Sequence, residues 1–439
     1  MDVSLAFVSN PYLDKKASQA RQRSILWEGY ERANLLSHDQ VELVKAIDKA
    51  SPEQIQQAVK GKGDAYAALI LHLLEKLSRP DTVQYVCILA DSILSGDESN
   101  AKYFHNLTAT NGDYPYEPFI KALRSGEELT DLEASKILTI LSCMSPTPAQ
   151  TDVTALCKWL SMHLASPNPQ IMDLAVQETE SLLGVREYRN TFWNTQNAVN
   201  HLVQELDKGS ATPQIQYQII FCLWLLTFEK DIASKINSQY DIIPKLVSIA
   251  KGAIKEKVIR VTIATLRNLV EKAPADNLAA MLVVKLLPFT ENLSTRKWSD
   301  TDIVEDIDFI KEKLQENFQS LTTFEQYASE VETGMLEWSP PHTSELFWKE
   351  NASRLEENNY SLLRSLARIL STATSTQVLA IAANDVGHYV KYSSKGGKRF
   401  LHDIGAKQRI MELMTHEDQD VRYQALSAVQ KYMHQAWDF

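Results

Sequence analysis

Glycine is scarce in this sequence, at 14 of 439 residues, whereas soluble proteins average about 7%. Because glycine most readily supplies the positive φ angles of tight turns, its scarcity favours helices over a hairpin-rich β fold. Long apolar runs are also missing. The longest extends only from Ile219 to Leu226, whereas a transmembrane helix needs roughly 20 apolar residues. We therefore expect a helical protein that contacts a membrane only through a partner.

Cysteine is rare as well, and no two of the four cysteines have C-x-x-C spacing. They are Cys87, Cys143, Cys157 and Cys222. Each lies in an apolar, helical stretch, so we expect buried free thiols in a reducing compartment rather than disulfides or a metal site. The N-terminal residues lack the charged region and long apolar stretch of a secretory signal. These features predict a cytosolic protein.

The motifs of common enzyme classes are missing too. Gly396-Gly397-Lys398-Arg399 comes nearest to a P-loop, but Tyr392 replaces its first glycine and arginine replaces its hydroxyl residue. His416-Glu417 lacks the second histidine of a zinc protease, and Asp385-Val386-Gly387 has no accompanying kinase element. We expect no catalytic residue, no cofactor and no metal. An enzyme of unusual type is the alternative.

An acidic stretch, Ser299–Asp308, has some likeness to a calcium loop. Glu305 occupies the position where an EF-hand needs glycine, and Lys311 occupies the position of its bidentate glutamate. We interpret the stretch as the capped start of a helix with an acidic first turn.

The net charge is −11, which repels phosphate backbones and argues against nucleic-acid binding. The charge is uneven along the chain. From Pro340 to the end there are 12 Lys or Arg and 11 Asp or Glu, whereas the preceding part holds 33 and 45. This change in charge balance near Pro340 suggests two domains with different partners.

An apolar pattern recurs at intervals of about 43 residues. Its first set, Ile215, Ile220, Leu223 and Leu226, falls on one face of a helix. The same offsets recur in Val258, Ile263, Leu266 and Leu269; in Ile171, Val176, Thr179 and Leu182; in Leu132, Ile137, Ile140 and Cys143; in Val378, Ala383, Val386 and Tyr389; and in Val421, Leu426, Val429 and Tyr432. Periods of about 40–47 residues are typical of HEAT and armadillo arrays. An irregular helical bundle with accidental periodicity is the alternative.

One segment interrupts the helices. Gly334 can end a helix, and Pro340 with Pro341 prevents one from continuing. Beyond them, Ser344 can cap a helix that begins at Glu345. We therefore predict an all-α, armadillo/HEAT-like superhelix in two domains, residues 1–332 and 342–439, joined by a linker at 333–341. A plain inter-repeat loop is the alternative.

The linker makes Gly334, Pro340 and Pro341 candidate hinge residues. We also expect the chain from Pro340 to its end to fold alone, because its two repeats share one core.

Several segments resemble the H-subunit family of the eukaryotic vacuolar-type proton ATPase. The most specific are Leu336-Glu-Trp-Ser-Pro340 and Phe347-Trp-Lys-Glu-Asn351. Others are Thr82–Tyr85, Val185–Arg189, Gln214–Leu226, Ile242–Leu246, Lys255–Lys272, Ala383–Gly387, His416–Asp418 and Val421–Leu426. The likeness covers about residues 20–439. One family loop, Ser371–Gln377, is uncharged here.

The resemblance implies a non-catalytic regulatory subunit of an ATP-driven proton pump. It implies an N-terminal domain bound to the peripheral-stalk subunits E and G, and a C-terminal domain that contacts the cytosolic part of the membrane-sector a-subunit. It implies that this domain inhibits the catalytic sector when that sector detaches. The expected location is the cytoplasmic face of vacuolar or endosomal membranes, and the cytosol after the sectors separate.

An importin-like armadillo scaffold that binds peptides is the second hypothesis. Such a groove needs a ladder of repeated Trp and Asn. Asn268 lies in one array helix, but Leu225 occupies the aligned position of the preceding repeat, so the ladder is incomplete.

A basic stretch near the C-terminus is the last candidate site. Lys391, Lys395, Lys398 and Arg399 lie close together with no acidic residue among them. Gly396-Gly397 predicts a flexible loop tip there. A solvated loop between helices is one interpretation. The other is a loop that contacts an acidic surface on a pump partner.

Overall fold

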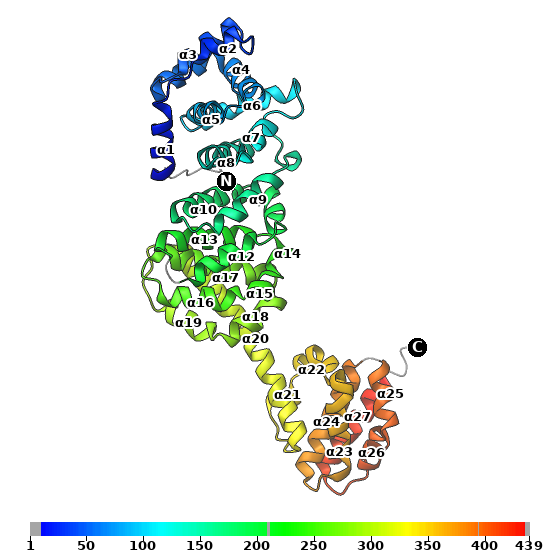
Figure 1. The fold of residues 1–439 in the computed structure, drawn as a ribbon. Coiled ribbons are helices and arrows are strands. Elements are labelled where there is room, and N and C mark those ends of the chain that lie inside the picture. Colours follow the sequence, from blue (N-terminus) through cyan, green and yellow to red (C-terminus); the bar gives the residue numbers. More distant parts are fainter. Residues whose placement is uncertain (1–9, 209–210, 394, 435–439) are drawn as a thin grey trace. The chain divides into compact units, whose positions relative to one another are not determined.

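The computed structural model describes residues 10–208, 211–393 and 395–434. Within these ranges all regular secondary structure is helical, and the predicted all-α repeat fold is confirmed (Figure 1). The chain divides into two compact units, residues 1–313 and 314–439. The first nine residues, for which we expect no secretory signal, lie outside the described part.

The first unit contains α1 to α19 and the start of α20. Its elements are α1 (Pro11–Arg21), α2 (Trp27–Arg32), α3 (His38–Ile47), α4 (Pro52–Lys76), α5 (Pro80–Leu94), η1 (Glu98–Asn100), α6 (Ala101–Asn106), η2 (Leu107–Ala109), α7 (Tyr116–Leu123), α8 (Glu128–Cys143), η3 (Pro148–Gln150), α9 (Thr154–Leu164), α10 (Pro169–Gly184), α11 (Arg186–Trp193), α12 (Ala198–Asp207), α13 (Pro213–Leu226), α14 (Lys230–Ala233), α15 (Ile236–Tyr240), α16 (Ile242–Gly252), α17 (Glu256–Lys272), α18 (Pro274–Val283), α19 (Leu286–Ser294) and α20 (Thr301–Thr333).

The second unit contains the end of α20 and the helices that follow it. These are α21 (Pro340–Thr343), α22 (Glu345–Asn351), η4 (Ala352–Glu356), α23 (Glu357–Thr372), α24 (Thr376–Tyr392), α25 (Lys395–Asp403), α26 (Ala406–Leu413) and α27 (Gln419–His434).

Polar caps and prolines fix where many of these helices begin. Ser51 and Gln54 form a capping box at the start of α4, with Pro52 in the first turn. The acidic stretch opens α20 as expected, because the Asp300 carboxylate accepts a hydrogen bond of 3.0 Å from the Asp302 amide. The Ser344 hydroxyl caps α22 through the Phe347 amide at 3.2 Å. Capping of this kind stabilises a helix by typically about 1 kcal/mol.

The repeated apolar face is buried, as the periodicity predicts. In the first unit α5, α8, α10, α13 and α17 pack in that order. Leu223 of α13 and Leu266 of α17 are fully buried. Thr179, the one polar member of its set, is also buried, and its hydroxyl donates to the Ala175 carbonyl at 2.7 Å. Its polar group is therefore satisfied within its own helix.

Hydrogen bonds between neighbouring repeats join residues about one period apart. Tyr188 donates to the Ser142 carbonyl at 2.8 Å across 46 positions, and Asn277 donates to the Ala233 carbonyl at 3.0 Å across 44. The Ser299 amide donates to Glu256 at 3.0 Å across 43. The period in the sequence therefore corresponds to the stacking of the repeats, in which equivalent positions of successive repeats contact one another.

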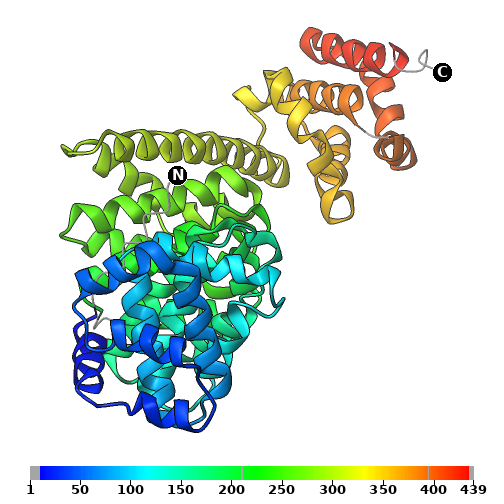
Figure 2. The same cartoon turned by 90° about the horizontal axis from the view of Figure 1, so that it is seen from above.

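The last helix departs from the predicted face. Val421 is buried, but Leu426 is 47% exposed. Ala425 and Ala428 are buried in its place. A Cβ on Gly387 would lie 2.9 Å from the Ala428 Cα, so these small residues let α24 and α27 pack closely, side by side (Figures 1 and 2).

The end of α20 belongs to the core of the second unit. Phe324, Tyr327 and Val331 are buried in one apolar cluster with Trp348. The Tyr327 and Trp348 rings meet edge-on, with centroids 5.3 Å apart. For this reason the compact units divide at Lys313–Leu314. The linker predicted at 333–341 lies further along the chain, inside the second unit.

Candidate functional site

The candidate hinge residues lie within a folded part of the second unit. Gly334 has a φ of +73° and follows the last turn of α20, where its amide donates to the Glu330 carbonyl at 3.0 Å. A positive φ favours glycine and ends the helix. Pro340 begins α21, and Pro341 is buried. Their role as a hinge stays a prediction.

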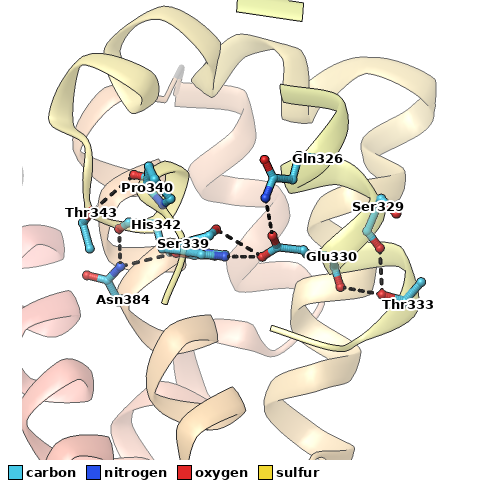
Figure 3. Close-up of polar contacts among 10 residues, drawn as sticks. Gln326, Ser329, Glu330, Thr333, Ser339, Pro340, His342, Thr343 and Asn384 are labelled. Atoms are coloured by element: carbon cyan, nitrogen blue, oxygen red, sulfur yellow. Dashed lines mark hydrogen bonds and ion pairs between the residues drawn. The ribbon is translucent and has the colours of Figure 1, made fainter. Parts of the chain in front are cut away.

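A buried histidine joins this segment to the rest of the unit (Figure 3). His342 of α21 has no exposed side-chain surface. Its Nδ1 lies 2.8 Å from a carboxylate oxygen of Asp385 on α24, and its Nε2 lies 2.9 Å from a carboxylate oxygen of Glu330 on α20. One imidazole therefore connects three helices.

Further hydrogen bonds surround this bridge. Asn384 donates to the His342 carbonyl at 2.8 Å, and also to Asp385 at 3.3 Å. Glu330 accepts bonds of 3.3 Å from the Gln326 amide and the Ser339 hydroxyl. Figure 3 shows His342, Ser339 and Glu330 in one connected network. Two carboxylates and an imidazole can bind and release a proton, but nothing here resembles a nucleophile aligned with a base.

The electrostatics of the bridge favour a bound proton. Burial alone lowers the pKa of His342, but the hydrogen bonds and charges of Asp385 and Glu330 outweigh it and raise that pKa above its usual value. Burial also raises the pKa of Asp385, although the contact with His342 opposes this. Both shifts favour the protonated state of the site.

The basic stretch does not form the predicted loop. Residues 395–403 form helix α25, and Gly397 is buried so closely that a Cβ would lie 1.7 Å from the Tyr389 hydroxyl. The burial of Leu401 and the stacking of Phe400 on Tyr360, with centroids 4.3 Å apart, favour a helix despite the adjacent glycines.

The structure places the basic residues in different surroundings. Lys391, at the end of α24, forms an ion pair of 2.7 Å with Glu345. Arg399 is exposed and Lys398 is half-buried. The side chain of Lys395 lies outside the described part. Their proposed contact with a partner stays a prediction.

The cysteines lie largely away from solvent: Cys87, Cys157 and Cys222 are buried. All four cysteines are free thiols, and burial raises the pKa of Cys143 and Cys157 to about 12. No group of three or more His, Cys, Asp or Glu within the described ranges could hold a metal ion. Among the helices of the same ranges, none is long and apolar enough to cross a membrane.

Comparison with known proteins decides the family. Two family models, both described as the H subunit of V-ATPase, match residues 11–314 and 320–437. The chain belongs to the V-ATPase H-subunit family. The junction between the two V-ATPase models falls within α20, close to the division at Lys313–Leu314.

Curated relatives carry the same family name. The V-type proton ATPase H subunit of Drosophila melanogaster is 35% identical over 97% of this chain and 91% of its own length. The V-type proton ATPase H subunit of Dictyostelium discoideum is 30% identical over 95% and 93%. The probable V-type proton ATPase H subunit of Oryza sativa subsp. japonica is 30% identical over 94% and 95%. An engineered protein of known crystal structure, at 14% identity and a TM-score of 0.48, covers 98% of both chains.

Sequence reasoning missed the His342 bridge. His342 lies inside the Leu336–Asn351 region that carries the likeness to the H-subunit family, and Asp385 follows it by 43 positions. That separation matches the repeat period. Searching for ionisable residues one period apart would have paired these two.

Proposed function

We propose that this chain is a non-catalytic regulatory subunit of a vacuolar-type proton-translocating ATPase. One observation carries the proposal: models of the V-ATPase H subunit match the chain on both sides of its division into two units. The described fold supports it too, because stacked helical repeats offer long surfaces to partner proteins. No enzyme motif was found in the sequence, which favours a role in regulation rather than catalysis.

The proposed regulation has two parts. In the assembled pump the chain couples ATP hydrolysis to proton transport. On the detached catalytic sector it inhibits hydrolysis. Two bodies, each with its own apolar core, suit such a protein, because one can keep its contacts while the other exchanges partners.

The proposed partners follow from the family resemblance. The first unit binds the peripheral-stalk subunits E and G. The second binds the cytosolic part of the membrane-sector a-subunit in the assembled pump, and the catalytic sector after it detaches. The chain then works on the cytoplasmic face of vacuolar or endosomal membranes, and is cytosolic when the sectors separate.

Adding the purified full-length chain to pump sectors that lack it tests both parts. ATP hydrolysis by the detached catalytic sector should fall, and ATP-driven acidification by membranes depleted of the chain should recover. An unrelated armadillo protein of similar size is the control. If neither activity responds to saturating amounts of the chain, the proposal is wrong.

A groove in the first unit supports the second hypothesis, a peptide-binding scaffold. The rings of Tyr217, Phe221 and Trp224 on α13, and of Phe228 just after it, form a row with successive centroid separations of 5.9, 5.0 and 4.8 Å. The groove is lined by these four rings and by Lys257, Arg260, Val261, Ala264, Arg267, Asn268, Glu271, Asp302, Glu305 and Asp306. Asp302 and Asp306 already pair with Arg260 and Arg267, so the feature that suits a basic peptide is the row of aromatic rings, whose faces attract cations.

The importin-like use of Asn268 is not supported by its contacts. Its side-chain amide donates to the Thr227 hydroxyl at 3.2 Å, within the repeat stack. Titrating the chain with a Lys-rich peptide, while following peptide anisotropy, tests the groove. Saturable binding that Trp224→Ala abolishes would favour a scaffold. Binding that is unchanged by this substitution would exclude the groove as its site.

A further inference from the structure

The two hydrogen bonds of the His342 bridge need two protons. With Asp385 and Glu330 ionised and His342 neutral, the site holds only one. A neutral imidazole has one N–H, and an ionised carboxylate only accepts. Both His342 nitrogens nevertheless lie within 2.9 Å of a carboxylate oxygen. The two bonds exist together only if the ring is an imidazolium, or if one carboxyl group keeps its proton.

Removing that proton damages the site whichever group held it. One carboxylate oxygen would then face the lone pair of a ring nitrogen at hydrogen-bond distance. His342 and Asp385 are fully buried, so water cannot replace the lost bond without rearrangement. An unpaired, buried acceptor of this kind is costly.

The bridge connects both ends of a non-helical stretch, residues 335–339, to another helix. Glu330 is in the last turn of α20, and His342 follows the non-helical stretch at 335–339. Asp385 lies in α24, a central helix of the second unit's core. The bonds of His342 thus fasten both ends of this stretch to α24.

We propose that His342 is a proton-operated latch: while the site holds its proton, the last turn of α20 and the 334–341 segment are fastened to α24, and this attachment weakens as the pH rises, while the apolar contacts of Phe324 and Tyr327 keep the rest of the helix end in the core. The latch is independent of the proposed function, because it concerns only contacts within this chain. Its use as a pH sensor beside a proton pump would rest on that function.

The charged neighbours of His342 determine the direction of the pH dependence. Asp385 faces the ring from α24, and Glu330 and Tyr327 face it from α20, with the Tyr327 and His342 ring centroids 5.5 Å apart. Lys431 of α27 and Asp385 also interact electrostatically. Because the carboxylates raise the pKa of His342, the stabilisation is fully present below the ring's unfolded pKa. This stabilisation is lost as the pH rises through the pKa of His342 in the folded chain.

Hydrogen exchange on the purified full-length chain tests the latch. Protection of peptides covering residues 324–342, corrected for intrinsic exchange rates, is followed from pH 6.5 to 9 and compared with peptides from α13 and α17. We expect protection of 324–342 to fall by roughly tenfold relative to these references. Equal pH profiles for the two regions would overturn the proposal.

The variant Glu330→Gln makes the test specific. A glutamine amide can donate to Nε2 of a neutral His342 while Nδ1–H donates to Asp385, so this latch needs no extra proton. We expect its protection to stay high at pH 9. The control Glu332→Gln removes an exposed charge from the same helix end and should keep the wild-type profile. Identical profiles for wild type and Glu330→Gln would contradict the latch.

A second measurement covers the case in which Glu330→Gln fails to fold. Histidine ring signals of the wild-type chain are followed by NMR through the same pH range, and His342 is assigned from the signal missing in His342→Gln. We expect the His342 signal to change over the pH interval in which protection is lost. A ring signal that stays constant there would overturn the proposal.

Discussion

The Ser135 hydroxyl on α8 donates a hydrogen bond of 3.1 Å to the Glu178 carboxyl group on α10, across 43 positions of the chain. Both side chains are buried, and the second oxygen of Glu178 has no hydrogen-bond partner. Burial raises the pKa of Glu178 to about 8, although Ser135 and Lys136 lower it in part. At neutral pH this carboxyl group therefore keeps its proton.

The substitution Glu178→Gln should weaken the pH dependence of stability. In the unfolded chain the carboxyl ionises near pH 4.5, so between there and about pH 8 rising pH favours unfolding. The slope is at most about 1.4 kcal/mol per pH unit. Glutamine removes this contribution, while buried Glu133, whose pKa is also raised, retains its own. In thermal melts, the melting temperature should fall less between pH 5.5 and pH 8 for the variant than for wild type.

Exposed Glu187 provides the control for that experiment. Glu187→Gln removes the same charge from the neighbouring helix and should melt like wild type at both pH values. If Glu178→Gln loses as much stability as wild type between them, Glu178 does not hold its proton in the folded chain.

The substitution Leu266→Asp should destabilise the first unit severely. Leu266 is fully buried on the repeated face, and an unpaired carboxylate there costs several kcal/mol. Ile254→Asp is the matched control, because Ile254 is 95% exposed. Chemical unfolding should show a loss above about 3 kcal/mol for the first variant and within about 0.5 kcal/mol for the second. Similar losses for both would refute the assigned face.

A fragment that begins at residue 314 should be more stable than one that begins at residue 340. The shorter fragment lacks Phe324 and Tyr327, which pack in the core with Trp348 and Phe347. We expect both to fold, with the shorter one melting roughly 10 °C lower or more. Calorimetry of the two fragments decides the matter, and equal melting temperatures would show that α20 adds nothing to this core.

Replacing Lys391, Lys395, Lys398 and Arg399 with serine should weaken binding to pump membranes and flatten its salt dependence. Exposed charges act mainly on association rate and are screened by salt. Binding is measured by co-sedimentation with depleted membranes across a salt series. A charge-matched control replaces exposed lysines of the first unit, namely Lys60, Lys62, Lys102 and Lys121. Equal binding by wild type and the C-terminal variant at every salt concentration would leave these residues without a role in docking.

The sequence predicted the repeats well because burial on one helix face leaves a periodic trace. Leu266 shows this clearly. Leu426 shows the limit: the apolar pattern assigns it to the buried face, but in α27 the packing against α24 buries Ala425 and Ala428 instead. The helix at 395–403 was also missed, because local glycine content favours a loop whereas packing of Gly397 against Tyr389 decides the outcome.

The candidate site was harder to predict for a different reason. His342 and Asp385 lie 43 positions apart, and no local sequence motif links the two. Their pairing comes from the fold, which brings positions one repeat apart together. Similarly, Gly334, the two prolines and the change in charge indicated a boundary near Pro340, but only the packing of Phe324 and Tyr327 shows where the core of the second unit begins.

The hydrogen bonds that join positions about 43 residues apart also limit how the chain can change in length. A residue inserted within α17 before Asn268 would rotate every later position of that helix by about 100° and separate the Asn268 side-chain amide from the Thr227 hydroxyl. A residue inserted between α16 and α17 would leave both helices in phase. Insertions and deletions among relatives should therefore gather in the connections, while the lengths of the long stacked helices stay nearly constant.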